Sequence, residues 1–273
     1  MIVNGKQIAG EIEWLLIKEL ESIPKQTIYF VIFGENKASE QFINIKSKVA
    51  ERIGIISKIK SYPKDWSTEE AIKTIKELSS ENIHGIVVQL PLPKQMDTSK
   101  VLDSISLDKD IDLLSNLSIE NYRKGKNGMV PPVASAVKSI LESQNIDIEN
   151  KNILIIGRGR LVGQPVAYML DLLKVNYEII DVNILISERI KKIKSADIII
   201  SGVGIPYMIK SDMVKDGVIL IDAGTTEQNS ELVGDIDPSC HDKTSLFSQT
   251  PGGIGPVTVI SLFKNLLYKN RQR

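Results

Sequence analysis

Three polar residues in the N-terminal half of the chain have side chains suited to proton transfer and to binding a polar ring. The first, Lys46, follows Phe42 by four positions, and on a helix this spacing puts both side chains on one face. A positioned lysine amine can transfer protons, and an aromatic ring can stack on a flat substrate. The simple alternative for Lys46 is a solvated charge on a surface helix.

Gln89 and Asp112 carry the other two polar groups. Gln89 is the first polar residue after the apolar run Ile86–Val88, so we expect it to project from the carboxyl end of a buried strand. An amide that only caps this strand is the alternative. Asp110 and Asp112 would point to opposite sides of an extended segment, so that one carboxylate reaches a cleft while the other stays in solvent.

A glycine loop in the C-terminal half has the sequence context of a dinucleotide site. An apolar strand at 152–156 leads directly into Gly157, Gly159 and Gly163, and a helix follows. Gly157 allows a sharp turn, Gly159 lets the backbone approach a pyrophosphate, and Gly163 permits close helix–strand packing. The spacing is one residue longer than the common fingerprint, and a doubly wound domain without a nucleotide is the alternative.

Two further runs are rich in proline and glycine. Residues 250–258 read Thr-Pro-Gly-Gly-Ile-Gly-Pro-Val-Thr, which predicts a rigid loop with few side chains against which a flat ligand can lie. A tight surface turn is the alternative. Far upstream, residues 85–93 read Gly-Ile-Val-Val-Gln-Leu-Pro-Leu-Pro, a strand that continues into a proline-containing segment.

Short apolar runs alternate with amphipathic stretches, which predicts an α/β fold with mainly parallel sheets. The residues with candidate chemistry fall at strand ends and on one helix, as such a fold requires. The stretch 107–132 has no clear period and is expected to be a long connection between domains. The apolar stripe of 256–273 predicts a helix that packs back on the first domain, with a cleft between the domains. We therefore expect a three-layer α/β domain at 1–130, completed by 256–273, and a Rossmann-like domain at 131–255.

Composition excludes several other classes of protein. Lys+Arg and Asp+Glu both total 34, so no global basic field exists to attract nucleic acid or a membrane surface. The apolar runs are too short to span a bilayer, and the N-terminus lacks the profile of a secretory signal. One cysteine and two histidines cannot form a disulfide or a structural zinc site, so we expect a cytoplasmic protein without a metal.

These motifs together resemble those of the bifunctional methylenetetrahydrofolate dehydrogenase/cyclohydrolase family. The matching features run in the family's order over nearly the whole chain: the helix of Lys46, the Gln89 run, Lys109–Asp112, the glycine loop and the loop at 250–258. The resemblance implies that Lys46 is the catalytic lysine, that Gln89 positions it, and that Asp112 holds the pterin.

The resemblance also implies the remaining site residues. The substrate would contact six positions: Phe42, Val88, Leu90, Pro251, Gly252 and Gly253. The dinucleotide would contact nine: Gly157, Arg158, Gly159, Asp181, Ile184, Gly204, Thr225, Gly255 and Thr258. A carboxylate suits the pterin, because two N–H groups on the edge of that ring can donate to its two oxygens.

Departures from the family pattern concentrate on the cofactor side. Phe42 replaces a tyrosine, which preserves ring stacking but removes a hydroxyl. Val133 stands in the stretch that replaces Pro-Cys-Thr-Pro, and Gly159 replaces the serine of Gly-Arg-Ser. Leu113 replaces a glycine after Asp112, and Ile184 replaces a serine.

The family resemblance implies a function in one-carbon metabolism and purine biosynthesis. It implies oxidation of 5,10-methylenetetrahydrofolate with NAD or NADP and hydrolysis of the methenyl product to 10-formyltetrahydrofolate. It also implies a homodimer with tetrahydrofolate derivatives as its partners. The alternatives are a homologue that retains only the cyclohydrolase and a folate- or nucleotide-binding protein without turnover.

The choice between NAD and NADP depends on opposing charges. Asp181 lies 24 positions after Gly157, close to where an acidic residue meets the ribose hydroxyls, and it would repel a 2′-phosphate. Arg158 and Arg160 favour a phosphate instead. We expect a preference for NAD.

Overall fold

The computed structural model describes residues 1–34, 37–126, 128–229 and 231–271. The chain divides into two compact units. The three-stranded unit comprises residues 12–131 and 262–273, and the five-stranded unit comprises residues 1–11 and 132–261. Each unit contains its own parallel sheet, so the predicted two-domain α/β fold is confirmed.

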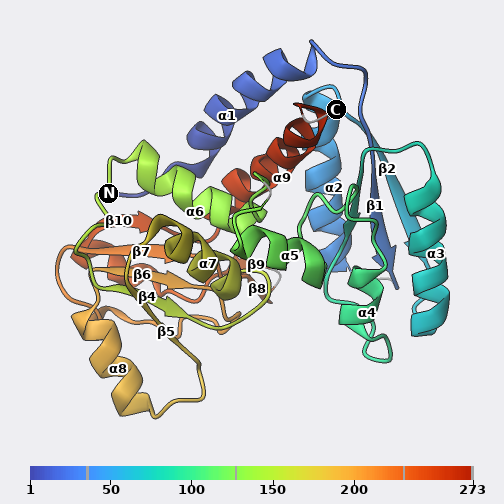
Figure 1. The fold of residues 1–273 in the computed structure, drawn as a ribbon. Coiled ribbons are helices and arrows are strands. Elements are labelled where there is room, and N and C mark those ends of the chain that lie inside the picture. Colours follow the sequence, from blue (N-terminus) through green and yellow to red (C-terminus); the bar gives the residue numbers. More distant parts are fainter. Residues whose placement is uncertain (35–36, 127, 230, 272–273) are drawn as a thin grey trace. The chain divides into compact units, whose positions relative to one another are not determined.

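The three-stranded unit has the sheet order β2-β1-β3, with all strands parallel. Its strands are β1 (Thr27–Phe33), β2 (Ile56–Tyr62) and β3 (Gly85–Val88), and its helices include α2 (Lys37–Arg52), α3 (Thr68–Ser80), α4 (Thr98–Asp103) and α5 (Asn116–Arg123). Tyr29, Val31 and Phe33 of β1 pack in one core cluster with α3, and α2 lies on the other side of the sheet (Figure 1). Because helices cover both faces, β1 is apolar along almost its whole length.

The five-stranded unit has the order β10-β7-β6-β4-β5, again parallel throughout. Its sheet strands are β4 (Ile153–Ile156), β5 (Tyr177–Ile180), β6 (Ile198–Ser201), β7 (Val218–Asp222) and β10 (Thr244–Ser248). The helices α6 (Pro132–Ser143), α7 (Gly163–Leu173) and α8 (Ile186–Ser195), the short helices η1 (Ser211–Met213) and η2 (Pro238–Lys243), and the antiparallel pair β8 (Thr226–Gln228) and β9 (Glu231–Val233) complete the unit (Figure 1).

Two helices contain residues of both units. The helix α1 (Gly5–Leu20) contains the first boundary, and α9 (Ile254–Arg271) contains the last. Within the three-stranded unit, Asn265 of α9 donates to the carbonyls of Ile111 and Val130, both at 2.9 Å. These bonds explain the predicted return of the C-terminal helix to the first domain.

Two sequence expectations about local structure were wrong or incomplete. The stretch 107–132, expected as a connection, contains α5, which begins after the N-cap Ser115. Residues 1–11, which the prediction assigned to the first domain, group with the five-stranded unit. They do so because Val3 and Gly5 donate backbone hydrogen bonds to Phe247 and Gly252.

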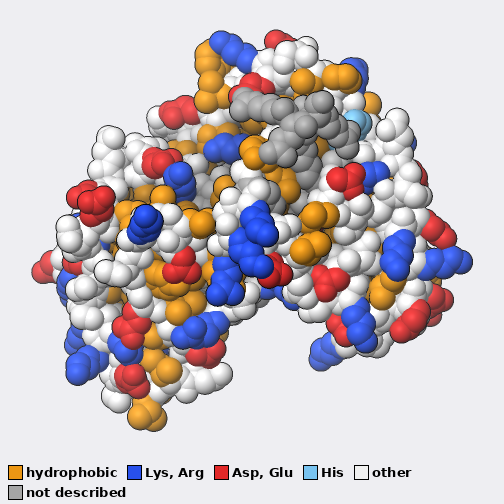
Figure 2. Space-filling view, in the orientation of Figure 1, with side chains coloured by type: hydrophobic (Ala, Val, Ile, Leu, Met, Phe, Trp, Pro, Cys, Tyr) orange, Lys and Arg blue, Asp and Glu red, His pale blue; other side chains and the backbone are white. Residues whose placement is uncertain are grey.

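The surface is of mixed charge, in line with the equal numbers of basic and acidic residues. Basic and acidic side chains are interspersed over the face drawn in Figure 2. In the part of the chain that the structure describes, no helix has both the length and the apolar character needed to cross a membrane.

Candidate active site

Lys46 and Gln89 meet in the three-stranded unit. Lys46 lies on α2 and is half-buried, because the neighbouring turns of the helix bury Ile43, Ser47 and Ala50 against the unit. Its Nζ donates a hydrogen bond of 3.2 Å to Oε1 of Gln89. Two residues 43 positions apart in the sequence are thus brought together, and the solvated-charge alternative for Lys46 does not describe its environment.

Hydrogen bonds of the backbone and of the side chain fix the orientation of Gln89. Its backbone N–H donates to the carbonyl of Val31 at 2.9 Å, which continues the ladder between β3 and β1. Its side-chain Nε2 donates to the carbonyl of Leu90 at 2.8 Å. With the amide nitrogen occupied, Oε1 is the atom left to face Lys46. The side chain therefore caps the adjacent backbone and orients the lysine at the same time.

Asp112 is the carboxylate that shares this neighbourhood with Lys46. Burial raises the pKa of Asp112 above its ordinary value of 3.8, the positive charge of Lys46 acts against this rise, and the charge of Asp110 adds to it. The resulting site combines an amine, an amide and a carboxylate in one unit. Such a set can transfer a proton and bind an edge of N–H donors.

Asp110 occupies the protein interior, so the expectation that the other aspartate stays in solvent was wrong. It is 0% exposed and accepts hydrogen bonds from the backbone N–H of Leu114 and Ser115 and from the Ser115 hydroxyl, at 2.7–3.1 Å. These bonds hold the turn after Asp112, where Leu113 has φ 55°. Asp110 therefore shapes the backbone that presents Asp112.

The apolar residues predicted to contact the substrate differ in exposure. Phe42 is half-buried one turn before Lys46 on α2. Leu90 is half-buried and packs against the core cluster of the unit, whereas Val88 is 1% exposed within that cluster. Phe42 and Leu90 therefore have side-chain surface available for a ligand, and Val88 supports the strand that carries Gln89.

In the five-stranded unit, the three glycines that follow β4 differ in their backbone conformation and in the space around them. Gly157 has φ 98°, which other residues rarely adopt. A Cβ on Gly163 would lie 1.8 Å from the carbonyl oxygen of Gly157, so the start of α7 packs directly on the loop. A Cβ on Gly159 would have nothing within 4 Å. Neither packing nor backbone strain explains a glycine at 159, and the position leaves room for a ligand to approach the backbone.

The other residues predicted to bind the dinucleotide lie on loops of the same unit. Arg158 donates from Nη2 to the carbonyl of Ile179 on β5 at 2.8 Å. Beyond β5, Asp181 accepts from the backbone N–H of Asn183 at 3.1 Å, and Ile184 is half-buried. Gly204 has φ 71°, and Thr225 is exposed just beyond β7.

The loop before α9 belongs to the five-stranded unit. Pro251 and Gly252 are exposed, and a Cβ on Gly253 would lie 2.5 Å from Oγ of Ser248. Gly5 supports this loop: its N–H donates to the carbonyl of Gly252 at 3.1 Å, and a Cβ on it would lie 1.7 Å from the oxygen of Gly253.

The first two turns of α9 contain the last two predicted cofactor residues. A Cβ on Gly255 would have open space around it, as at Gly159. The hydroxyl of Thr258 already donates to the carbonyl of Ile254 in the same helix, at 3.1 Å. Gly255 thus leaves room for a ligand, and Thr258 has its donor occupied.

Sequence reasoning missed three residues that hold these loops. One is Gly5, for which the Asn4-Gly5 pair before an amphipathic stretch was the available signal. The others are Asp222 and Asp235, two fully buried aspartates of the five-stranded unit. An aspartate directly after the apolar run Val218–Ile221 was a signal for the first, and we found none for the second.

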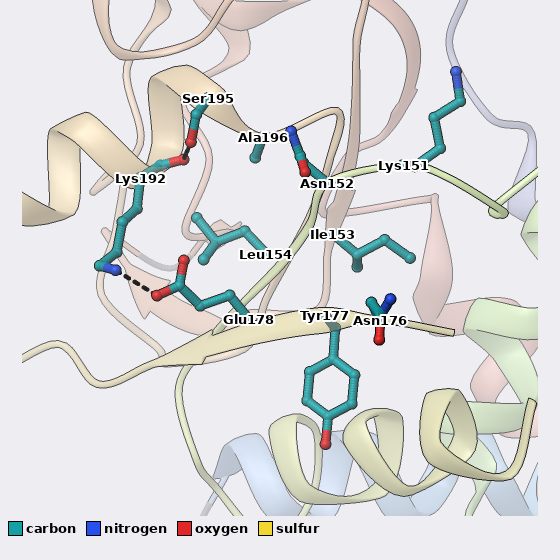
Figure 3. Close-up of a pocket in the computed structure, with 10 residues that line it drawn as sticks. All are labelled: Lys151, Asn152, Ile153, Leu154, Asn176, Tyr177, Glu178, Lys192, Ser195 and Ala196. Carbon is teal, nitrogen blue, oxygen red and sulfur yellow. Dashed lines mark hydrogen bonds and ion pairs between the residues drawn. The ribbon is translucent and has the colours of Figure 1, made fainter. Parts of the chain in front are cut away.

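A hollow of about 320 Å³ lies in the five-stranded unit at the amino ends of the strands, opposite the end that carries the glycine loop. It lies at the amino ends of β4 and β5 and at the end of α8, with Ile153 and Leu154 among its lining residues (Figure 3). Lys192 pairs there with Glu178. No residue predicted for catalysis or binding lines this hollow. Among the described residues, no three His, Cys, Asp or Glu side chains are grouped to hold a metal ion.

Comparison with known families gives matches over both units. The sequence model of the tetrahydrofolate dehydrogenase/cyclohydrolase catalytic domain matches residues 3–112, and that of the NAD(P)-binding domain of the same family matches residues 131–273. The bifunctional protein FolD of Sulfurovum sp. (strain NBC37-1) is 33% identical over 280 residues, which cover 100% of this chain and 99% of that protein. FolD of Hydrogenobaculum sp. (strain Y04AAS1) is 34% identical over 284 residues with the same coverage.

Solved structures agree with these matches. The bifunctional FolD enzyme of Campylobacter jejuni superposes with a TM-score of 0.93 at 29% identity, covering 100% of this chain and 99% of that one. The Trypanosoma brucei FolD, solved with NADP and an inhibitor, has a TM-score of 0.93 at 27% identity, covering 100% and 97%. The NAD-dependent methylenetetrahydrofolate dehydrogenase of Saccharomyces cerevisiae has a TM-score of 0.83 over 100% and 97% of the chains, and at 15% identity it shares the fold.

Proposed function

Because this chain belongs to the tetrahydrofolate dehydrogenase/cyclohydrolase family, we propose that it oxidises 5,10-methylenetetrahydrofolate and hydrolyses the methenyl product to 10-formyltetrahydrofolate. NAD or NADP is the cofactor of the first reaction. The observation that carries this proposal is the 3.2 Å hydrogen bond between Lys46 and Gln89, in the neighbourhood of Asp112. The three residues that the family resemblance assigns to catalysis are thus held in one unit.

Lys46 is the proton-transfer group of the hydrolysis. A water molecule attacks the cationic methenyl carbon and loses a first proton, which goes to the ring nitrogen that is released as N–H. The C–N bond to that nitrogen breaks as the remaining hydroxyl becomes the formyl C=O, and the proton of that hydroxyl passes to solvent. An amine held next to the attacking water can accept the proton of the water in its neutral form and donate it to the leaving nitrogen. Gln89 holds the amine at the position where both transfers are possible.

Asp112 and Phe42 bind the folate. The ionised carboxylate of Asp112 accepts two hydrogen bonds from the N–H groups on the pterin edge. Phe42, one turn before Lys46, stacks on a ring of the substrate. Pro251, Gly252 and Gly253 form a loop with little side-chain bulk that is suited to the same substrate.

The five-stranded unit binds the dinucleotide, which supplies the hydride acceptor when bound. The open space at Gly159 and Gly255 fits close approach of such a ligand to the backbone. The N-terminus of α7 follows the glycine loop, and the positive end of the helix dipole favours a pyrophosphate there. Asp181 favours NAD, and a titration in which NADP binds more than tenfold tighter than NAD would overturn that preference.

Two absorbance assays test the proposed function: formation of NAD(P)H with methylenetetrahydrofolate, and decay of methenyltetrahydrofolate. In the Lys46→Met variant we expect the cyclohydrolase kcat to fall at least about 100-fold, the usual contribution of a positioned proton-transfer group. Lys48→Met is the matched control, because Lys48 is an exposed lysine on the same helix, and it should stay within twofold of wild type. Wild-type rates equal to the uncatalysed rates in both assays contradict the proposal.

We further propose that the protein is a cytoplasmic homodimer whose formyl product supplies purine biosynthesis. The family resemblance supports each part of this proposal. Light scattering after gel filtration tests the oligomeric state, and a mass of 30.3 kDa at micromolar concentration contradicts the dimer.

A further inference from the structure

Two aspartates are fully buried at the edge of the five-stranded sheet where its strands end. Asp222 is the last residue of β7, and Asp235 follows β9 by two positions. Both are 0% exposed. Burying an ionised carboxylate costs several kcal/mol unless hydrogen bonds compensate for the lost water. The hydrogen bonds of these two carboxylates show which segments of the protein they hold.

Asp235 binds the loop that follows β6. One carboxylate oxygen accepts from the Ser201 hydroxyl at 2.7 Å and from the N–H of Val203 at 2.8 Å. The other oxygen accepts from the N–H of Ile205 at 2.9 Å. These donors lie on both sides of Gly204, the glycine with φ 71° that was predicted to contact the dinucleotide.

Asp222 binds the loop that follows β7 and the segment that carries Asp235. Its Oδ1 accepts from the N–H of Gly224 and from that of Asp235, and its Oδ2 accepts from the N–H of Ile236, all at 3.1 Å. Gly224 directly precedes Thr225, another residue predicted to contact the cofactor. The two carboxylates thus fix both loops to one another.

Glycines at two positions make this arrangement possible. A Cβ on Gly224 would lie 2.1 Å from the carboxyl carbon of Asp235, and a Cβ on Gly234 would lie 1.9 Å from Oδ2 of Asp222. Each carboxylate therefore occupies the space of a missing side chain. Burial raises the pKa of Asp222 to about 7, a measure of what it costs to keep such a group away from water.

We propose that Asp222 and Asp235 are positioning residues for the dehydrogenase reaction. They hold the loops after β6 and β7 in the backbone conformation that receives NAD(P)+. Ligands of open α/β sheets bind at the carboxyl ends of the strands, and these two loops lie there. The inference rests on the proposed function for the identity of the ligand. It goes beyond that function by assigning a role to two residues that do not themselves need to touch the ligand.

The test exploits the fact that the two activities differ in their need for the dinucleotide. Asp235→Asn keeps the side-chain shape but replaces one acceptor oxygen with an NH₂ group, so one of the loop N–H groups loses its partner. We expect the KM for NAD(P)+ to rise roughly tenfold, the effect of losing one hydrogen bond to a charged group. The cyclohydrolase kcat should stay within twofold of wild type, because Lys46, Gln89 and Asp112, the residues proposed for its catalysis, lie in the three-stranded unit.

Two further variants keep the test decisive. Asp237→Asn is the matched control: Asp237 lies two residues away, caps η2 through the N–H of Ser239, and should leave both activities unchanged. Ser201→Ala removes a single bond to Asp235, and its KM for NAD(P)+ should rise two- to threefold. It supplies the measurement if Asp235→Asn does not fold.

Direct binding of NADH or NADPH, followed by the fluorescence of the reduced nicotinamide, separates this inference from the proposed function. Weaker binding in Asp235→Asn supports the positioning role even if wild type shows no turnover. Unchanged binding and unchanged KM in Asp235→Asn and Ser201→Ala overturn it. Equal losses of both activities together with a lower Tm also overturn it, because they indicate a purely structural role.

Discussion

The two units of the molecule prepare their binding sites by different means. In the three-stranded unit, the proposed chemistry depends on the polar side chains of Lys46, Gln89 and Asp112. A hydrogen bond joins the first two, and burial raises the pKa of the third. In the five-stranded unit, half of the predicted binding positions are glycines, and the backbone is the surface proposed to recognise the ligand. The comparison teaches that a substitution in the first site removes a functional group, whereas replacing a glycine in the second changes the backbone conformation or fills the space left for the ligand.

The largest expected loss of activity comes from Gly163→Ala, and the comparison with Gly159→Ala tests how each glycine acts. In Gly163→Ala, the new Cβ meets the carbonyl oxygen of Gly157 at 1.8 Å, so the loop backbone must move. A displacement of about 1 Å costs on the order of 100-fold in rate, and we expect such a fall in dehydrogenase kcat/KM. Assays of both activities and a measurement of Tm test this expectation.

Gly159→Ala is the partner variant in this experiment. The added methyl group meets no protein atom, so we expect an unchanged Tm and a loss confined to NAD(P)+ binding. A lower Tm in Gly159→Ala, with unchanged dinucleotide binding, would show that this glycine serves the fold rather than the ligand.

A smaller effect, on the three-stranded unit, concerns pH. Burial raises the pKa of Asp112, so this carboxyl is protonated at higher pH in the folded protein than an ordinary aspartate. Its contribution to folding stability is therefore greatest at low pH and is lost as the pH rises through the raised pKa. Pterin binding needs the carboxylate, so the folate KM should rise as the pH falls, by about tenfold per pH unit below that pKa.

Variants at two aspartates check the origin of this pH dependence. Asp112→Asn should have a raised folate KM that no longer changes over the same pH range. Asp108→Asn, at an exposed aspartate of the same segment, should keep the wild-type profile. An unchanged profile in Asp112→Asn assigns the titration to another group.

The smallest expected effect is that of Phe42→Tyr. Phe42 is half-buried on α2, and a tyrosine preserves the ring while adding the hydroxyl of the family pattern. We expect both activities to change less than about threefold, since the new group is worth at most one neutral hydrogen bond. A rise of more than tenfold in either activity would mean that the natural residue weakens the site.

The fold and the three polar residues were predictable because their signals are local or tied to strand ends. Apolar runs marked the parallel strands, and Gln89 lies where such a run ends. Phe42 and Lys46 needed only a helix to lie one turn apart. The contact between Lys46 and Gln89, however, joins residues 43 positions apart, and only the resemblance to a family indicated it before the structure did.

The interior positions of charged groups could not be predicted. Asp110 was expected in solvent, because a carboxylate in a polar stretch gives no sign of the three donors that surround it. Asp235 is comparable: besides the Ser201 hydroxyl, its partners are backbone N–H groups 30 and 32 positions away, and backbone donors leave no trace in a sequence. The helix α5 was missed because it is short.

The unit boundaries inside α1 and α9 bear on how this protein can be dissected or recombined. No single cut yields either half with all its parts, because residues 1–11 and 262–273 each belong with a partner that is distant in the sequence. Exchange of one contiguous gene segment would therefore separate the sheet of a unit from the terminal residues that belong to the same unit. The dehydrogenase and cyclohydrolase modules should consequently be inherited together, and a bisected gene should yield insoluble fragments.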